Sequence, residues 1–383
     1  MTTYLLAGGG TAGHVNPLLA TADELRRRDP EATIVVIGTA TGLEARLVPE
    51  RGYELVTIPK LPFPRRPNRA AAAFPAGLRR VIADLARLIR ERHVDVVVGF
   101  GGYAAAPAYL AARRARVPLV IHEANARPGL ANRLGARFTP YVGLAFRAGV
   151  LPHGRFVGMP LRREIQALAG RPAAAMPGDA TPGGALAPDS AALPLAAARA
   201  EGLALFDLRG DAPVLLVTGG SLGAAQLNGS VFAAAADLVA AGWQVLHITG
   251  DRSELVDPGI PGYRMLRYCD RMELALAVAD LAVSRAGAAT VSELAALGVP
   301  SVLVPYAVGN GEQRFNAVDL VDAGGAVLVR DADFTPDWIR SSLLPLLSDR
   351  SRISTMAAAA LGAGVTDGSA RTVDLIEQAL KGA

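Results

Sequence analysis

The chain has 383 residues, a formal net charge of +4, 51% hydrophobic residues, 41 glycines and 26 prolines. A chain of this length exceeds the size at which one hydrophobic core stops growing, so we expect two domains of a folded α/β protein rather than a disordered chain. The single cysteine, Cys269, excludes an internal disulfide framework and a cysteine-based zinc site, and it is consistent with a reducing compartment.

The N-terminus predicts the opening of a Rossmann-like unit. Residues 3–7 form a short apolar run, the loop GGGTAGH follows at 8–14, and a helical pattern extends from about residue 17 to residue 28. A strand, a glycine loop and a helix in this order are typical of that unit. Because the first residues lack a basic region, we interpret them as a strand and not as a signal peptide. No stretch reaches about 18 uncharged apolar residues, so we expect no membrane-spanning helix.

A dinucleotide site is the first alternative for this glycine loop. Gly8, Gly10 and Gly13 satisfy the pattern G-x-G-x-x-G. A dinucleotide enzyme would also end its second strand in an acid that binds the adenosine ribose. The predicted second strand, residues 33–38, is instead followed by Thr39 and Ala40, and the next acid is Glu44. The loop is therefore predicted to approach a different phosphate-bearing ligand.

Two further units place polar or glycine residues at the end of a predicted strand. Residues 95–99 lead into GFGGYAAAP (99–107), and residues 118–121 lead into His122, Glu123, Ala124 and Asn125. Open α/β sheets bind ligands at the carboxyl ends of their strands. From about residue 167 to residue 199 the chain is dominated by Ala, Pro and Gly, which predicts an irregular linker or insertion.

The second half of the chain repeats the pattern of the first. Residues 213–218 predict a strand, GGSLGA (219–224) a second glycine loop, and the following residues a helix. Further strands are expected at 244–249, 263–266, 281–284, 301–305 and 326–329, with helices between them. This alternation implies parallel sheets. A final helix at about 367–381 carries Val373, Leu375, Ile376 and Leu380, so it must cover another surface.

Residues 284–317 predict a site for a nucleotide-linked sugar. The small residues 286–289 allow a tight turn into a helix, whose free N–H groups could hold a phosphate. Glu293 lies on that helix, where its carboxylate could accept both hydroxyls of a ribose. After a predicted buried strand come polar residues suited to a sugar ring, namely Asn310, Glu312, Gln313, Arg314 and Asn316. The alternative is a strand, a capped helix and a polar loop without a ligand.

With these residues in place, the chain resembles the MurG family of inverting glycosyltransferases nearly from end to end. The family transfers N-acetylglucosamine (GlcNAc) from UDP to undecaprenyl-pyrophosphoryl-muramoyl-pentapeptide. The resemblance is carried by GGGTAGHVNP (8–17), GFGGYAAAP (99–107), HEAN (122–125), GMPLR (158–162), TGGSLGA (218–224), RAGAATVSELAALGVPSVLVPY (285–306) and NGEQRFNA (310–317). The chain departs from the residues usual in the family at Ala124, Met159, Leu222 and Glu312.

The resemblance implies an α/β fold of two Rossmann-like domains facing across a cleft, the GT-B architecture. Residues 1–162 would bind the acceptor and the membrane, and a final helix at about 367–383 would pack back on them. Residues 163–210 would form the linker or insertion. Residues 211–366 would bind the UDP-sugar donor.

Inverting transfer needs a base, and His14 is the predicted one. Its unperturbed pKa of about 6.5 is close to the working pH, and a helix N-terminus lowers the pKa of a histidine. The alternatives are that His14 binds the acceptor pyrophosphate or caps the helix. Glu123 is a second catalytic candidate, which could assist His14 or bind the acceptor. Other residues predicted to bind the acceptor are Thr11, Gly13, Gly101, Gly102, Tyr103 and Asn125.

On the donor side, the resemblance assigns one group of residues to each part of UDP-GlcNAc. It places the ribose on Glu293, the phosphates on the N–H groups of Ala288 and Ala289 and on Ser221, the uracil near Cys269 with Arg162 alongside, and the sugar hydroxyls on Glu312 and Gln313. A helix N-terminus and a serine hydroxyl can hold a pyrophosphate without a metal. The sequence predicts no protein-held metal and requires no cofactor, while Mg²⁺ bound with the diphosphate stays open.

Residues 61–92 predict how the enzyme meets a lipid-linked acceptor. Apolar Leu61, Phe63, Phe74 and Leu78 lie among Arg65, Arg66, Arg69, Arg79 and Arg80. Partial insertion at up to about 1.5 to 3 kcal/mol per apolar side chain, with about 1 kcal/mol per arginine near anionic lipid, suffices for reversible binding. We therefore expect peripheral binding to an anionic membrane surface at its cytoplasmic face. The alternative is a solvated basic helix that packs its apolar stripe on its own domain. Nucleic acid is not expected as a partner, because aromatic residues are sparse in this segment.

Two other functions share parts of this pattern. An enzyme like the UDP-GlcNAc 2-epimerases would use the same two-domain architecture and donor loops, but it has no use for the apolar and basic surface of residues 61–80. A non-catalytic UDP-sugar-binding module would keep Glu293 and Gln313 without needing His14.

Overall fold

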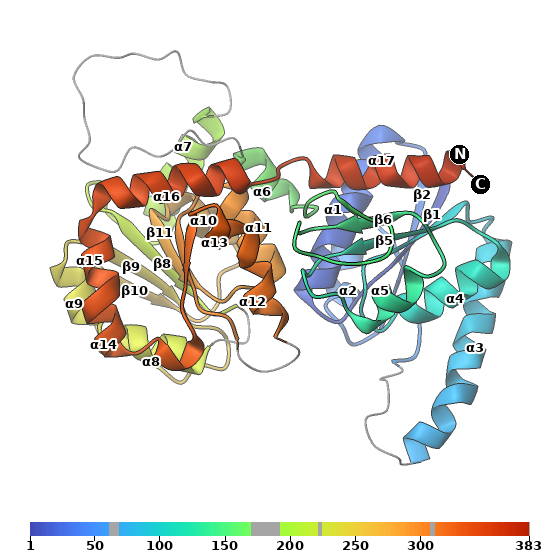
Figure 1. Cartoon of the computed structure of the whole chain (residues 1–383), viewed down its shortest axis with the longest axis horizontal. Coiled ribbons are helices and arrows are strands. Elements are labelled where there is room, and N and C mark those ends of the chain that lie inside the picture. Colours follow the sequence, from blue (N-terminus) through green and yellow to red (C-terminus); the bar gives the residue numbers. More distant parts are fainter. Residues whose placement is uncertain (61–68, 170–191, 221–223, 307–310, 383) are drawn as a thin grey trace. The chain divides into compact units, whose positions relative to one another are not determined.

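The computed structural model describes residues 1–60, 69–169, 192–220, 224–306 and 311–382 (Figure 1). The chain divides into two compact units. Unit 1 comprises Met1–Arg163 and Asp367–Ala383, and unit 2 comprises Glu164–Thr366. Each unit is built on a parallel sheet with helices around it, so the predicted α/β class with two Rossmann-like domains is confirmed.

The sheet of unit 1 is entirely parallel in the part of the chain that the structure describes. Its seven strands are, in spatial order, β3 (Glu54–Thr57), β2 (Thr33–Gly38), β1 (Thr3–Ala7), β4 (Val96–Gly99), β5 (Leu119–Glu123), β6 (Val142–Leu144) and β7 (Gly154–Phe156). The order reverses between β1 and β4, where β1 pairs with both β2 and β4. Such a switch point opens a crevice at the carboxyl ends of the two strands.

Helices cover the sheet of unit 1 because its central strands are apolar on both faces. β1 and β4 are buried along their whole length and are rich in Leu and Val, as parallel strands between two helix layers must be. The helices are α1 (Ala12–Arg28), α2 (Glu44–Glu50), α3 (Arg69–Glu91), α4 (Ala105–Ala115), α5 (Leu130–Gly135) and α17 (Gly368–Lys381).

Two boundaries differ from the prediction in ways that matter for function. α1 begins at Ala12, about five residues before the predicted start, and Pro17 lies inside it. His14 therefore lies in the first turn of the helix. β5 continues to Glu123, so that His122 and Glu123 are the last residues of the strand and not the start of the loop. The sequence predicted a loop at these two residues because their side chains are polar, although both are buried.

The C-terminal helix α17 is an integral part of unit 1. Val373, Leu375 and Ile376 are buried in the same hydrophobic cluster as the inner side chains of α1 and β4. Arg28, at the end of α1, donates hydrogen bonds to Asp374 Oδ1 at 2.7 Å and to Glu377 Oε1 at 2.9 Å. The apolar stripe of α17 therefore covers α1 and the sheet of unit 1, as the sequence led us to expect.

Unit 2 repeats the architecture with six strands in its described residues. In spatial order they are β10 (Tyr263–Leu266), β9 (Gln244–Ile248), β8 (Val214–Thr218), β11 (Leu281–Ser284), β12 (Ser301–Leu303) and β13 (Ala326–Leu328). Its helices are α6 (Arg163–Leu168), α7 (Ala192–Leu205), α8 (Ala225–Ala233), α9 (Ala235–Ala240), α10 (Met272–Val278), α11 (Ala288–Ala296), α12 (Glu312–Asn316), α13 (Val318–Asp322), α14 (Pro336–Trp338), α15 (Leu344–Ser348) and α16 (Arg350–Ala363). The order reverses between β8 and β11, which gives this unit its own switch point.

The expectation of irregular structure from residue 167 to residue 199 is wrong for the part after residue 191. α7 begins at Ala192, and Arg199 on it donates to Asp280 Oδ2 at 2.9 Å and to the carbonyl of Val278 at 2.7 Å. Alanine is the strongest helix former, so an alanine-rich stretch folds as a helix once a partner fixes it.

Candidate active site

Two glycine-rich loops meet at the switch point of unit 1. The loop after β1 contains Gly10 at φ 91°, and the loop after β4 contains Gly101 at φ 87° and Gly102 at φ 82°. A Cβ atom on Gly102 would lie 2.4 Å from the carbonyl oxygen of Gly9. Only glycine accommodates both this close approach and the positive φ. The two predicted acceptor loops are therefore in direct contact.

His14 is half-buried beside the second of these loops. Its Nδ1 lies 3.1 Å from Thr11 Oγ1, and its Nε2 faces Gly101, where an added Cβ would come within 3.2 Å of it. Burial lowers the pKa of His14 from its ordinary value. The pKa is thus lowered as expected, but its main cause is burial. At neutral pH the imidazole is neutral, which a general base requires.

Glu123 has a different environment from the one expected of a catalytic acid or base. Its Oε1 accepts a hydrogen bond from the N–H of Asn125 at 2.9 Å, and its Oε2 accepts from the N–H of Gly129 at 3.0 Å and from Asn132 Nδ2 at 2.9 Å. The side chain is buried, and burial raises its pKa. Three hydrogen bonds thus hold the carboxylate in place. Glu123 therefore shapes the loop after β5, and its role in catalysis stays a prediction.

Asn132 and Tyr109 link Glu123 to the glycine loops, and sequence reasoning missed both. Tyr109, fully buried on α4, donates from its hydroxyl to Asn132 Oδ1 at 2.6 Å. Asn132 Nδ2 donates to Glu123 and lies near Gly101, where an added Cβ would be 3.5 Å from it. Burial raises the pKa of Tyr109, so its hydroxyl remains a donor. No sequence signal marks these residues, because their pairing depends on tertiary contact.

The remaining predicted acceptor residues surround the same loops. Tyr103 is 46% exposed, and the ammonium of Lys60 lies 5.4 Å from the centre of its ring. Thr11 is exposed, and Gly13 is half-buried in the first turn of α1. Asn125 is half-buried and is held by its N–H to Glu123. The structure thus brings the predicted acceptor residues to one end of one sheet.

In unit 2, the residues predicted to bind the phosphates and the ribose follow β11, one of the two strands at the switch point. α11 begins at Ala288 after Gly287, so the N–H groups of Ala288 and Ala289 lie in its first turn. Glu293 is buried one turn further along the same helix, and Cys269 is half-buried in the segment after β10. Ser221 lies outside the described residues. Arg162 belongs to unit 1, apart from the other predicted donor residues in the chain's division.

A pocket of about 990 Å³ opens beside these residues in unit 2. It is lined by Gly219, Ala224, Ala225, Gln226, Asn228, Gly229, Arg252, Ser253, Glu254, Leu255, Arg285, Tyr306, Gln313 and Asp331. Of the predicted donor residues that the structure describes, Gln313 is the one that lines it. Gln313 Oε1 accepts from the N–H of Tyr306 at 2.8 Å. Its amide nitrogen is thereby the group available to donate to a sugar hydroxyl.

Arg285 is a charged residue of this pocket that sequence reasoning gave no role. It is buried, donates to Asp331 Oδ1 at 2.5 Å and to the carbonyl of Val304 at 3.0 Å, and lies 5.4 Å from the centre of the Tyr306 ring. These contacts fix the carboxyl ends of β11 and β12 relative to each other. Glu312, the other predicted sugar contact, is half-buried at the start of α12.

The predicted membrane segment is described only in part. Leu61, Phe63, Arg65 and Arg66 lie outside the described residues, and Arg69 is the first residue of α3. Phe74 and Leu78 are half-buried, whereas Arg79 and Arg80 are exposed. The second half of α3 packs on the sheet, as expected from its apolar stripe.

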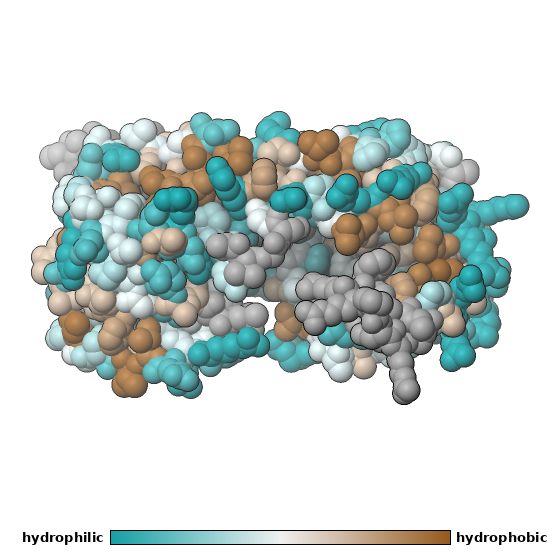
Figure 2. All heavy atoms as spheres, turned by 60° about the horizontal axis from the view of Figure 1, so that its bottom comes forward, coloured by the Kyte–Doolittle hydropathy of each residue, from teal (hydrophilic) through white to brown (hydrophobic). Residues whose placement is uncertain are grey.

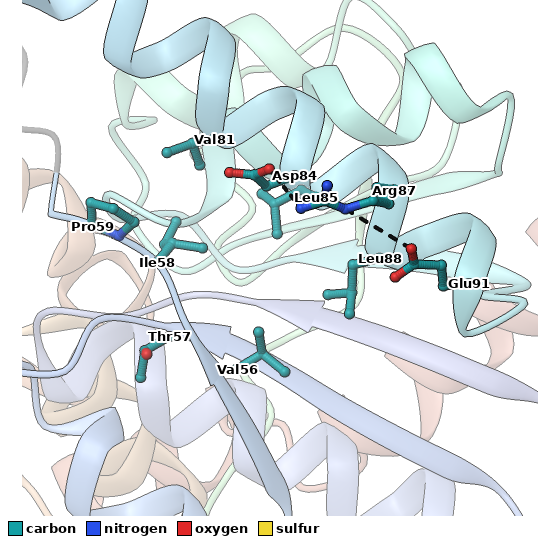
Figure 3. Close-up of a pocket in the computed structure, with 10 residues that line it drawn as sticks. All are labelled: Val56, Thr57, Ile58, Pro59, Val81, Asp84, Leu85, Arg87, Leu88 and Glu91. Atoms are coloured by element: carbon teal, nitrogen blue, oxygen red, sulfur yellow. Dashed lines mark hydrogen bonds and ion pairs between the residues drawn. The ribbon is translucent and has the colours of Figure 1, made fainter.

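A small pocket lies between α3 and the edge strand β3, with Val81, Leu85 and Leu88 facing Val56 and Ile58 (Figure 3). Val81 and Leu85 belong to the buried core of unit 1.

Of the helices that the structure describes, none has the length and apolar character to cross a membrane. Nor does any group of three His, Cys, Asp or Glu side chains among the described residues form a metal site.

Comparisons with known proteins agree with this arrangement. The glycosyltransferase family 28 N-terminal domain matches residues 4–143, and its C-terminal domain matches residues 214–372. The chain is 61% identical over 386 residues to the UDP-N-acetylglucosamine--N-acetylmuramyl-(pentapeptide) pyrophosphoryl-undecaprenol N-acetylglucosamine transferase of Leifsonia xyli subsp. xyli, covering 100% of both chains. It is 56% identical to the enzyme of the same name from Clavibacter sepedonicus, covering 99% of this chain and 97% of that one.

Solved structures give the same result at the level of the fold. The crystal structure of Acinetobacter baumannii MurG has a TM-score of 0.75 and 26% identity, covering 99% of this chain and 100% of that one. A putative UDP-N-acetylglucosamine 2-epimerase from Listeria monocytogenes has a TM-score of 0.66 with 15% identity, covering 100% and 98%, which shows a shared fold alone. The chain belongs to the MurG family of glycosyltransferases, within glycosyltransferase family 28.

Proposed function

We propose that this chain transfers GlcNAc from UDP-GlcNAc to the muramoyl 4-hydroxyl of undecaprenyl-pyrophosphoryl-MurNAc-pentapeptide, with inversion at the anomeric carbon. The observation that carries this is the 61% identity over the whole chain to a transferase of that name. The product is the lipid-linked disaccharide of peptidoglycan synthesis. The epimerase alternative has only the shared fold in its favour, at 15% identity.

In the proposed mechanism His14 is the general base. The acceptor oxygen attacks the anomeric carbon of GlcNAc, its proton passes to His14 Nε2, and the bond from the anomeric carbon to the UDP oxygen breaks. Support for this role comes from the neutral state of His14 and from its Nε2 facing Gly101 at the switch point. Thr11, Tyr103 and Asn125 would hold the acceptor around it.

Unit 2 would bind the donor. Glu293 would accept the ribose hydroxyls, the N–H groups at the start of α11 would hold the diphosphate, and Gln313 would donate to the sugar. Support comes from the position of Ala288 and Ala289 in the first turn of a helix, where backbone N–H groups favour anions. UDP is then a stabilised leaving group. A bound Mg²⁺ ion would contribute further charge stabilisation to the same diphosphate.

The test measures transfer from labelled UDP-GlcNAc to the lipid-linked muramoyl-pentapeptide. We expect transfer by the native chain and a loss of about 10²-fold or more in kcat for His14→Ala, with donor binding retained. Epimerised UDP-sugar, or binding without turnover, would contradict the proposal. Near-normal turnover of His14→Ala would contradict the base assignment alone.

We further propose peripheral binding to the cytoplasmic face of an anionic membrane through α3. The exposed Arg79 and Arg80, next to the half-buried Phe74 and Leu78, support this. On the face drawn in Figure 2, apolar side chains form separate groups among hydrophilic ones.

Flotation with vesicles containing anionic lipid should recover the native chain, and Arg79→Glu/Arg80→Glu should reduce recovery. Arg113→Glu/Arg114→Glu on α4 is the control, and equal loss in both variants would contradict a specific role of α3.

A further inference from the structure

Glu44 is a buried carboxylate that reaches back from α2 to the glycine loop after β1. It is 0% exposed. Its Oε2 accepts a hydrogen bond from the N–H of Gly10 at 2.8 Å. Its Oε1 accepts from the N–H of Thr39 at 2.8 Å and from Thr39 Oγ1 at 2.7 Å. One side chain thereby joins the loop after β1 to the loop after β2.

Three glycines lie against the side chain of Glu44, and a larger residue in place of any of them would collide with it. A Cβ atom on Gly9 would lie 2.5 Å from Glu44 Oε1, and one on Gly42 would lie 2.1 Å from Oε2. A Cβ atom on Gly38 would lie 2.4 Å from the Cγ of Glu44. The carboxylate therefore occupies the space between the loop after β1 and the loop after β2, and the three glycines keep that space open for it.

Glu44 is ionised at neutral pH although it is buried. Burial raises its pKa, but the hydrogen bonds from Gly10 and Thr39 outweigh that effect, so the pKa is lowered overall. Two effects raise the pKa of His14 and offset part of the effect of burial on it: first a hydrogen bond with the backbone of Gly9, and then the negative charge of Glu44. Two other titratable groups lie at the same loops: Tyr103 packs near Gly10, and Glu123 binds Asn132, which lies near Gly101. The first turn of α1 contains no acid.

We propose that Glu44 is a positioning residue for the transfer reaction, which holds the glycine loop in the conformation that presents His14 and places a negative charge near that side chain. This inference rests on the proposed role of His14. Glutamine cannot replace the carboxylate, because its amide would turn two hydrogen atoms toward either the N–H of Gly10 or that of Thr39. One of these buried N–H groups would lose its acceptor.

The test compares Glu44→Gln with Asp95→Asn in the complete chain. Asp95 Oδ2 accepts from the N–H of Thr3 at 2.8 Å, at the other end of the same strand β1, so it controls for the loss of a similar bond. For Glu44→Gln we expect kcat at least about tenfold lower, an unchanged affinity for UDP, and an acid limb of the kcat/KM profile displaced to lower pH. A merely structural carboxylate would not move that limb. A kcat loss no greater than that of Asp95→Asn, or an unmoved acid limb, overturns the proposal.

A second variant covers the case in which Glu44→Gln does not fold. Thr39→Val removes one donor to the carboxylate and retains its charge, so we expect kcat to fall about threefold. Normal kcat in this variant would overturn the proposal. Transfer by the native chain in the same assay tests the proposed function separately, because only the ratios of variant to native activity bear on Glu44.

Discussion

Thr11 Oγ1 and His14 Nδ1 lie 3.1 Å apart in the first turn of α1. For Nε2 to accept a proton, Nδ1 must carry the ring hydrogen and donate it to Thr11. Because a hydroxyl can accept as well as donate, the contact with Thr11 is compatible with this tautomer and helps to orient the ring.

Replacement of Thr11 by valine should consequently lower kcat. Valine preserves the shape of the side chain but removes the oxygen, so His14 Nδ1 loses this hydrogen-bond partner and the ring loses part of what orients it. We expect kcat about tenfold lower with a smaller change in the acceptor KM. Thr11→Ser should restore most of the activity in steady-state assays. A variant that loses acceptor affinity at unchanged kcat would indicate instead that Thr11 contacts the substrate.

Replacement of Glu293 by alanine should weaken donor binding. A carboxylate that accepts two ribose hydroxyls forms charge-assisted hydrogen bonds worth about 1.5 to 3 kcal/mol each. The donor KM should therefore rise at least about tenfold, and kcat at saturating donor should change less. Glu312→Gln is the matched control, since it introduces the residue usual at that position in the family and should leave the donor KM nearly unchanged. An unaltered KM for Glu293→Ala would refute the ribose assignment.

Replacement of Ile376 by alanine should destabilise unit 1. Ile376 on α17 is completely buried in the cluster that α17 shares with α1 and β4. Loss of a fully buried isoleucine costs about 2 to 5 kcal/mol. Urea unfolding should show this loss in the free energy of unfolding, and Leu380→Ala, at a half-buried position of the same helix, should show a smaller one. Equal losses would mean that α17 is not held by this core.

Acidification should remove stability that depends on His247. This side chain is buried between Tyr263, whose hydroxyl lies 2.6 Å from Nδ1, and Asn228, whose Oδ1 lies 3.2 Å from Nε2. Burial lowers the pKa of His247 to about 4. The unfolded chain takes up a proton at about pH 6.5, before the folded chain does, so the free energy of unfolding falls as the pH falls from about 6.5 to about 4. The contribution over this window is roughly 3 kcal/mol.

A variant isolates this contribution from that of other groups. The stability difference between the native chain and His247→Asn, measured by urea unfolding, should shrink as the pH is lowered from about 7 to about 5. His153→Asn at an exposed position serves as the control and should keep a constant difference. A difference for His247→Asn that stays constant or grows on acidification would contradict the assignment.

The sequence by itself determined the class of fold and predicted where the two sites lie. Apolar runs such as residues 213–218, each followed by glycines and a helical pattern, predict parallel sheets with ligands at their carboxyl ends. These features are local, because strand and helix periodicity and the backbone freedom of glycine are properties of short segments. The position of Glu293 on a helix that follows a strand came from the same local patterns, whereas the structure was needed to place His14 in the first turn of α1.

Only the tertiary structure decided which distant side chains are hydrogen bonded to each other. Glu44 contacts Gly10 across 34 positions of sequence, and Asn132 joins Glu123 to Tyr109 from a separate helix. Glu123 is a catalytic candidate in the sequence, and only the tertiary structure shows that it also binds the loop after β5 and Asn132 on α5. A sequence shows which hydrogen-bond donors and acceptors the protein contains. Which of them pair, and which remain for a substrate, depends on distances and burial that arise only when distant segments pack together.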